Sequence, residues 1–188
     1  EYHDGRTSEP SRLTTPDSSG IARRLAGMLA AGTTHAAMEL SSHALDQHRT
    51  AGTLLDAAVI TNITQDHFDY HHDFASYRRS KLRIFNYLKP AGLAIVNVDD
   101  EGSRSCLEEA PKRVMTYGLD QSADVTARVL RATLAGSQFE LSVGIERQIM
   151  ETPLIGRHNV SNCLAAATVG LLSALFNVVN VFTSVQTG

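Results

Sequence analysis

Two short apolar segments in this chain each end abruptly in a cluster of polar side chains. The first segment leads into Ser41 and the hydroxyl, imidazole, amide and guanidinium groups that continue to Arg49. The second passes through Val59 into Thr61 and Asn62. In α/β proteins, apolar residues fill the strands and polar residues at their carboxyl ends bind ligands. Two such ends so close together in the sequence predict a single site.

Helices and strands alternate along most of the chain, as in a parallel sheet covered by helices. Helices are expected from Pro16 to Gly32, from Asp73 to about Leu88, from Ser103 to Glu109 and from Asn159 through Leu171. The strands between them are expected at His35–Leu40, Asp56–Thr61, Leu93–Val98 and Arg113–Tyr117. Antiparallel strands are expected at Val125–Thr133, Gln138–Val143 and Gln148–Glu151, with turns at Gly136 and Gly144. The predicted fold class is therefore α/β, a mostly parallel sheet flanked by helices with an antiparallel β subregion.

The composition is that of a globular domain large enough to have its own core. The 188 residues are 43% hydrophobic and 20% charged, and the formal net charge is −3. The sequence has no long basic run, which argues against nucleic acid as a partner. The two cysteines, Cys106 and Cys163, show neither metal-site spacing nor a disulfide framework. This fits a reducing, cytoplasmic setting, and we expect a monomer.

Both ends of the chain read like cuts through a larger protein. Residues 1–11 are polar and without pattern, whereas residues 159–188 contain no Asp, Glu, Lys or Arg. The stretch from Leu164 to Phe182 is long enough to suggest a membrane span, but it includes polar residues and is rich in Ala and Gly. A buried helix followed by a frayed tail is the preferred interpretation, so no membrane span is expected.

The helix expected after Asp73 carries a lysine within an apolar stripe. The apolar members recur at three- and four-residue spacing, at Phe74, Tyr77, Phe85 and Leu88. Lys81 lies in the middle of this stripe. In one interpretation its stem packs while its ammonium reaches water. In the other it is held near a site, where desolvation lowers the pKa of the amine. A neutral amine can react with carbon dioxide to form a carbamate, which is an anionic metal ligand.

Other polar residues also have both a structural and a functional interpretation. Glu39 is expected in an otherwise apolar strand, where an unpaired buried carboxylate would be costly. The structural interpretation is a salt bridge or an exposed strand edge, and the functional interpretation is a carboxylate that faces a site. Residues 66–73, with His67 nearest to a strand end, form a hydrated loop or bind a divalent cation. Thr14 and Thr15, like residues 157–162, cap a helix or bind anionic, sugar or purine groups. The sequence has no GxxxxGK[ST] or GxGxxG motif for binding phosphate.

Taken together, five segments resemble signature sequences of the Mur ligase family. They are Thr14–Pro16, Met38–Leu45, Thr61–His71, Tyr77–Phe85 and Leu154–Asn162, in the family's order. The resemblance implies the family's central, P-loop NTPase-like domain at residues 12–172, with 1–11 a truncated edge and 173–188 a divergent tail. It also implies an ATP-dependent amide ligase that adds the third amino acid to UDP-MurNAc-L-Ala-D-Glu in peptidoglycan synthesis.

The resemblance further implies roles for individual residues. Lys81 matches the family's carbamylated lysine, which helps to hold a magnesium ion, and Glu39 and His67 match the other magnesium positions. The residues that match positions for the UDP-muramoyl dipeptide are Thr14, Thr15, Ser41, Gln47 and Arg49. Asn159 and Asn162 match asparagines associated with ATP. The implied cofactor is Mg²⁺, and the implied substrates are ATP, the UDP-muramoyl dipeptide and an amino acid.

The implied reaction passes through an acyl phosphate, formed when the substrate carboxylate attacks the γ-phosphate of ATP. The family's phosphate-binding loop is expected just before residue 1, so the chain alone is expected to show no ligation. After about Leu171 the sequence stops resembling the family, as in a fragment, a truncated gene or a shifted reading frame. Two alternatives stay open: a sibling Mur or folylpolyglutamate-type ligase, and a non-catalytic remnant that binds only metal or nucleotide sugar.

Overall fold

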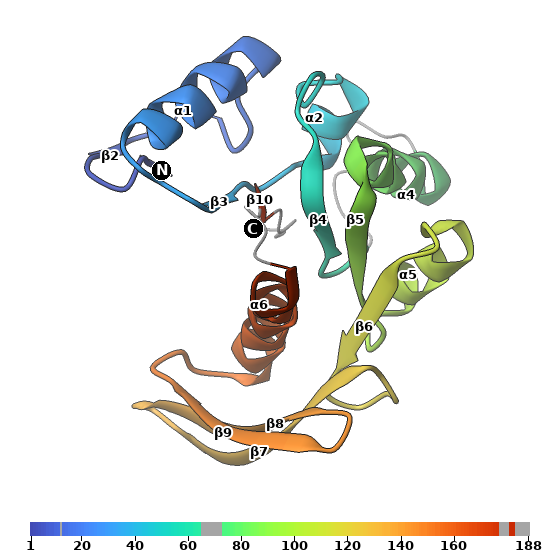
Figure 1. Cartoon of the computed structure of the whole chain (residues 1–188). Helices are drawn as coiled ribbons and strands as arrows, with labels where there is room; N and C mark the ends of the chain where they lie inside the picture. The colour runs from blue at the N-terminus through green and yellow to red at the C-terminus, as the bar shows by residue number, and fades with distance from the viewer. Residues whose placement is uncertain (12, 65–72, 177–180, 183–188) are drawn as a thin grey trace.

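A six-stranded sheet organises the fold, in the order β4-β5-β6-β7-β8-β9 (Figure 1). The computed structural model describes residues 1–11, 13–64, 73–176 and 181–182, with side chains described as far as residue 171. The strands are β4 Leu55–Ile60, β5 Leu88–Asn97, β6 Val114–Gly118, β7 Val125–Thr133, β8 Gly136–Val143 and β9 Glu146–Thr152. Strands β4 to β7 are parallel to one another, whereas β8 and β9 pair antiparallel. The predicted α/β class with an antiparallel subregion is confirmed.

Polar side chains start most of the helices by accepting hydrogen bonds from free backbone amides. The helices are α1 Ser18–Ala30, α2 Ser42–Asp46, α4 Phe74–Leu82, α5 Glu101–Arg104 and α6 Arg157–Phe176, with 3₁₀ turns η1 Arg83–Tyr87 and η2 Ser105–Glu109. Asp17, Ser41, Asp73 and Asp100 cap α1, α2, α4 and α5 in this way. Each of the four helices therefore begins directly after a loop with defined geometry.

Helices cover both faces of the parallel strands, which explains why β4 is apolar along nearly its whole length. Val59 lies in one core cluster with Leu164 of α6, whereas its neighbour Ile60 lies in a second cluster with Tyr77 of α4 and Cys106. Successive side chains of a strand point to opposite faces, so the two clusters lie on the two sides of the sheet. Figure 1 shows α6 on one side and α4 and α5 on the other.

Several predicted elements differ from the structure in their bounds: the helix expected at Ser103–Glu109 is α5 followed by η2, and β5 begins five residues before the expected Leu93. Two differences bear on the site. The strand expected at His35–Leu40 is reduced to β3 Ala36–Ala37, which pairs in parallel with β10 Val181–Phe182. The helix expected to reach Leu88 is α-helical only to Leu82, after which a 3₁₀ turn leads into β5. Leu88 pairs with Leu55 of β4, so strand pairing overrides the helical periodicity.

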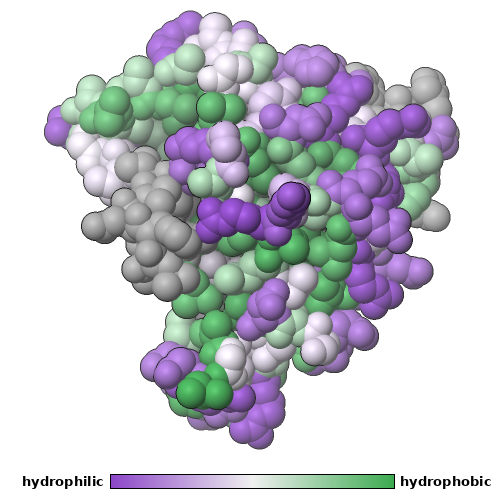
Figure 2. All heavy atoms as spheres, turned by 45° about the vertical axis from the view of Figure 1, so that its right-hand side comes forward, coloured by the Kyte–Doolittle hydropathy of each residue, from purple (hydrophilic) through white to green (hydrophobic). Residues whose placement is uncertain are grey.

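The remaining elements are small or lie at the surface. Near the amino terminus, β1 Tyr2–His3 and β2 Ser8–Glu9 form a two-stranded sheet. The face drawn in Figure 2 mixes hydrophilic and apolar side chains, with hydrophilic ones dominating its right-hand side. Among the described residues, none of the helices is both long and apolar enough to span a membrane.

Candidate functional site

Residues from three separate loops form a hydrogen-bonded group beside β3. The buried Thr15 hydroxyl donates to the carbonyl oxygen of Glu39 at 2.9 Å and accepts from the amide of Ser41 at 3.2 Å. Arg49 donates from Nη1 to the carbonyl oxygen of Thr15 at 2.9 Å, and from Nε and Nη2 to Oε1 of Gln47 at 3.0 and 2.7 Å. These contacts bring together most of the residues predicted to bind the UDP-muramoyl dipeptide.

The strand expected to include Glu39 ends at Ala37, just before this group. Beyond Ala37, the backbone at Glu39 and Ser41 bonds to the Thr15 hydroxyl. Ser41 then caps α2 by accepting from the amide of Ala44 at 3.2 Å. The polar strand end therefore becomes a fixed turn that leads from Glu39 to α2.

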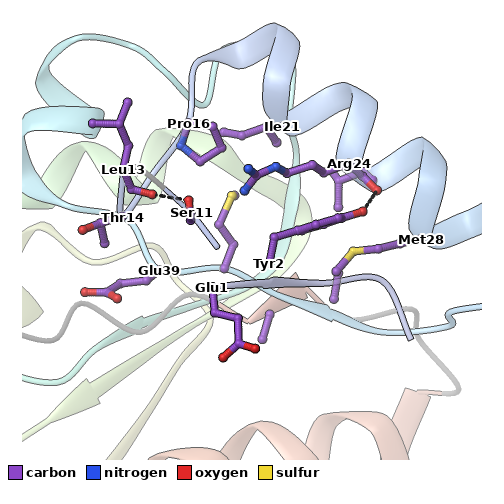
Figure 3. Close-up of a pocket in the computed structure, with 14 residues that line it drawn as sticks. Glu1, Tyr2, Ser11, Leu13, Thr14, Pro16, Ile21, Arg24, Met28 and Glu39 are labelled. Atoms are coloured by element: carbon purple, nitrogen blue, oxygen red, sulfur yellow. Dashed lines mark hydrogen bonds between the residues drawn. The ribbon is translucent and has the colours of Figure 1, made fainter. Parts of the chain in front are cut away.

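A hollow of about 400 Å³ opens next to this group, between α1 and the amino-terminal segment (Figure 3). Thr14 and Glu39 lie on one side of it, and Tyr2 and Arg24 lie on the other. The Tyr2 hydroxyl donates to the carbonyl oxygen of Arg24 at 3.0 Å, and the Arg24 guanidinium lies 4.6 Å from the centre of the Tyr2 ring. Glu39 is half-buried on the wall of this hollow.

Lys81 is buried rather than extended into water. Its side chain is 2% exposed, and its Nζ donates to the carbonyl oxygen of Asn62 at 3.0 Å. The ammonium also lies 4.8 Å from the centre of the Tyr77 ring, within the range of a cation–π contact. The interpretation in which the ammonium reaches water is therefore wrong for this lysine. Its amine lies instead just beyond the carboxyl end of β4.

A larger cleft, of about 730 Å³, lies at the carboxyl ends of β4, β5 and β6. The residues around it include Thr61, Asn62, Asn97, Asp99, Asp100, Asp120, Arg157, Asn159 and Asn162. The structure thus brings together the end of β4 and the start of α6, which the sequence separates by almost a hundred residues. An ion pair between Asp120 and Arg157 crosses between the β6–β7 loop and α6. Both predicted ATP residues, Asn159 and Asn162, belong to this cleft.

The end of β5 supplies residues that the sequence interpretation did not single out. The Asn97 amide donates to the carbonyl oxygen of Thr61 at 2.8 Å. The Asp99 carboxylate accepts hydrogen bonds from three amides of the β6–β7 loop. The Asp100 carboxylate accepts from the amide of Ile63 at 2.9 Å. A signal for them existed, because Asn97, Asp99 and Asp100 are polar residues at the end of the clearest predicted strand.

Burial raises the pKa of the Tyr117 hydroxyl, and the nearby Asp100 and Asp99 carboxylates raise it further. The hydroxyl has no hydrogen-bonding partner among the residues that the structure describes. Tyr117 therefore stays neutral at physiological pH and packs as part of the core beneath α6.

In the described parts of the chain, the predicted site residues border two hollows rather than the single site that the two polar strand ends predicted. Thr14 and Glu39 border the smaller hollow, and Asn159 and Asn162 border the larger cleft. His67 and its acidic and histidine neighbours at positions 65–72 lie outside the described residues. Within the described ranges, no group of three or more His, Cys, Asp or Glu residues is arranged to hold a metal ion.

Comparison with known proteins identifies the family. The family model described as "Mur ligase middle domain" matches residues 2–170. The chain belongs to the Mur ligase family. The resemblance found in the sequence is therefore confirmed.

Among its Mur ligase relatives are several named UDP-N-acetylmuramoyl-L-alanyl-D-glutamate–2,6-diaminopimelate ligase. The one from Halalkalibacterium halodurans is 37% identical over 174 residues, 91% of this chain and 36% of the relative. The one from Gloeobacter violaceus is 40% identical over 160 residues, 85% of this chain and 32% of the relative. This Mur ligase chain thus spans about a third of the length of these relatives.

Solved structures of Mur ligases share the fold. A ligase of the same name superimposes with a TM-score of 0.76 and 32% identity, covering 85% of this chain and 34% of the other. MurF from Acinetobacter baumannii superimposes with a TM-score of 0.56 and 27% identity, covering 62% of this chain and 25% of the other. The agreement is therefore greater with the diaminopimelate ligase than with MurF.

Proposed function

We propose that this chain is the ATP-binding middle domain of a ligase that adds the third amino acid, 2,6-diaminopimelate in the named relatives, to UDP-MurNAc-L-Ala-D-Glu. The observation that carries the proposal is the buried Lys81, whose Nζ lies at 3.0 Å from the Asn62 carbonyl oxygen at the cleft. Burying a lysine is costly, and this supports a specific role for Lys81.

Lys81 acts in this proposal as a carbamate. The neutral amine attacks carbon dioxide, a C–N bond forms, and the proton leaves the nitrogen to give an anionic carbamate. This replaces a buried cation, which would repel a metal ion, by two oxygen donors of the kind that Mg²⁺ prefers. Together with Glu39 and His67, Lys81 would hold Mg²⁺, which when bound offsets charge on the transferred phosphoryl group.

The larger cleft is proposed to bind ATP. Asn159 and Asn162 present amide groups from the first turns of α6, at the edge of a cleft that the Asp120–Arg157 ion pair helps to shape. Amides can both donate to and accept from a purine ring. The start of a long helix also favours negative charge, so the phosphate groups of a nucleotide suit this part of the cleft.

The group around Thr15 is proposed to bind the UDP-muramoyl dipeptide. Arg49 is held by the Thr15 carbonyl oxygen and the Gln47 side chain, so its position is set before any ligand arrives. A guanidinium fixed in this way is suited to a carboxylate or phosphate of the substrate.

In the proposed reaction, the dipeptide carboxylate attacks the γ-phosphorus of ATP and ADP leaves. The amino group then attacks the acyl carbon, phosphate leaves, and the amine loses a proton.

The experiment that tests this function is a segment exchange. Residues 2–170 replace the matching segment of the Geobacillus kaustophilus diaminopimelate ligase, which is 38% identical over 175 residues. We expect release of phosphate from ATP that depends on both the UDP-muramoyl dipeptide and 2,6-diaminopimelate, with formation of the tripeptide product. The parent ligase and a reaction without dipeptide are the controls. A chimera that folds like the parent but binds neither ATP nor dipeptide would overturn the proposal.

A further inference from the structure

The peptide group between Asn62 and Ile63 is held from both sides by charged side chains. Its carbonyl oxygen, which belongs to Asn62, accepts from Nζ of Lys81 at 3.0 Å. Its N–H, which belongs to Ile63, donates to Oδ2 of Asp100 at 2.9 Å. A cation and a carboxylate therefore bind opposite ends of one planar peptide unit. Lys81 belongs to α4, and Asp100 lies just after β5. The Asn62–Ile63 peptide therefore connects these two parts of the fold through hydrogen bonds.

Asp100 is itself fixed in place. The same Oδ2 atom accepts from the amide of Ser103 at 2.6 Å, which starts α5. Gly102, two residues after Asp100, lies very close to the backbone of Ile63. A Cβ at Gly102 would be 2.1 Å from the Ile63 carbonyl oxygen. The end of β5 and the end of β4 thus form a tightly packed unit. Movement of the Asp100 carboxylate would move the Ile63 amide with it.

One of the contacts of Lys81 is made with this unit. Its side chain is 2% exposed, so water does not compete freely for the ammonium. Within a buried chain of hydrogen bonds, each bond polarises the next. A carboxylate that accepts from the Ile63 N–H increases the negative charge on the carbonyl oxygen of Asn62, which strengthens the bond from Lys81. The centre of the Tyr77 ring also lies 4.8 Å from the ammonium.

We propose that Asp100 is a positioning residue for Lys81, acting through the Asn62–Ile63 peptide. Asp100 does not touch the amine; it holds the acceptor that the amine binds. The inference rests on the proposed function, because the position of Lys81 matters only if its amine takes part in the chemistry of the site. The inference assigns Asp100 to the same function. Asp100 lies 19 residues after Lys81 and follows a different strand, β5.

The test measures proton exchange at two nitrogens of the 188-residue chain by NMR, in buffer free of carbon dioxide. The signals are those of Lys81 Nζ, assigned by its loss in Lys81→Arg, and of the Ile63 amide. We expect Asp100→Ala to speed exchange at the Ile63 amide by at least about tenfold, the effect of losing its charge-assisted hydrogen bond. Exchange at Lys81 should speed up by more than about threefold, because the Asn62 carbonyl oxygen loses the group that polarises and positions it. Asp100→Asn keeps a neutral acceptor and should give an intermediate change. If Asp100→Ala does not fold, Asp100→Asn provides the measurement.

The matched control is Asp99→Ala. The Asp99 carboxylate is the chain neighbour of Asp100 but accepts from amides of the β6–β7 loop, so exchange at Lys81 should change by less than about twofold. Faster exchange at Ile63 with unchanged exchange at Lys81 would show a structural role only and would overturn the inference. A separate NMR experiment with ¹³C-bicarbonate tests the carbamate. If the unmodified chain shows no carbamate signal, this counts against the proposed function. The effect of Asp100 on proton exchange at Lys81 is a separate result and does not depend on the carbamate.

Discussion

Nη1 of Arg49 donates a hydrogen bond of 2.9 Å to the carbonyl oxygen of Thr15, 34 residues earlier in the chain. The same guanidinium binds the Gln47 side chain through two further nitrogens. These bonds use the fixed fork of arginine, which lysine cannot reproduce. The loop before α1 and the loop after α2 are therefore joined by one side chain.

Arg49→Lys is accordingly expected to weaken binding of the UDP-muramoyl dipeptide. A lysine can keep the charge but not all of these bonds, and we expect an affinity loss of about tenfold, which is within the usual worth of a hydrogen bond to a charged group. Isothermal calorimetry on the segment-exchange ligase measures this. The control is Arg147→Lys on β9, because Arg147 is exposed and donates to the nearby carbonyl oxygens of Gly144 and Glu146. Equal affinities for Arg49→Lys and the unmodified protein would contradict the role of Arg49.

Gly102→Ala is expected to destabilise the chain. The added Cβ would lie 2.1 Å from the backbone oxygen of Ile63, so the ends of β4 and β5 must separate. We expect a loss of about 1–3 kcal/mol in the free energy of unfolding, measured by urea denaturation. The matched control is Gly170→Ala in α6, where a Cβ meets nothing within 4 Å. Because alanine favours helix, this control should gain up to about 1 kcal/mol. Equal stabilities of the two variants would show that the close approach at Gly102 does not exist.

The two cysteines are expected to react at different rates with a thiol reagent. Cys106 is fully buried, and this burial raises the pKa of its thiol from 9.0 to about 11. Since the thiolate is the reactive form, Cys106 should stay unreactive at pH 8, whereas the half-buried Cys163 should react first. Cys163→Ser is the control, and in urea both thiols of the unmodified chain should react. Rapid labelling of the folded Cys163→Ser variant would refute the burial of Cys106.

The same thiol predicts a loss of stability at high pH. Its pKa is higher in the folded chain than in the unfolded chain, so the folded state keeps the proton over the interval in which the unfolded state releases it. Its contribution is therefore complete below pH 9 and is lost as the pH rises from 9 through about 11. The free energy of unfolding should fall less steeply over this interval in Cys106→Ala. Identical slopes would mean that the thiol does not titrate differently on folding.

Much of the fold could be predicted from local patterns. Val125–Thr133 was expected as a strand and is β7 with the same bounds. Asp17 and Asp73 cap α1 and α4 where the sequence indicated, because an aspartate before an apolar helical pattern is a strong local signal. Gly136 was expected in a turn, but it is the first residue of β8. Only a glycine fits there, because a Cβ would lie 2.2 Å from the carbonyl oxygen of Thr152 in β9.

The site was only partly predictable, because its contacts join distant segments. Lys81 in an apolar stripe allowed two interpretations, and only the fold shows that the carbonyl oxygen of Asn62 receives its Nζ. Asp100 and Ile63 are 37 residues apart, so no local pattern connects them. Polar residues at the ends of the first two expected strands were recognised as candidates, whereas those at the end of β5 were not.

The most direct measurement of the central claim is the activity of Lys81→Ala in the segment-exchange ligase. If a carbamate on Lys81 holds the metal, phosphate release should fall by at least about tenfold to a hundredfold, the range that loss of a group supporting a metal ligand already costs. Added short-chain carboxylic acids should partly restore activity by supplying the missing oxygen donors. Activity that is unchanged in Lys81→Ala would contradict the account.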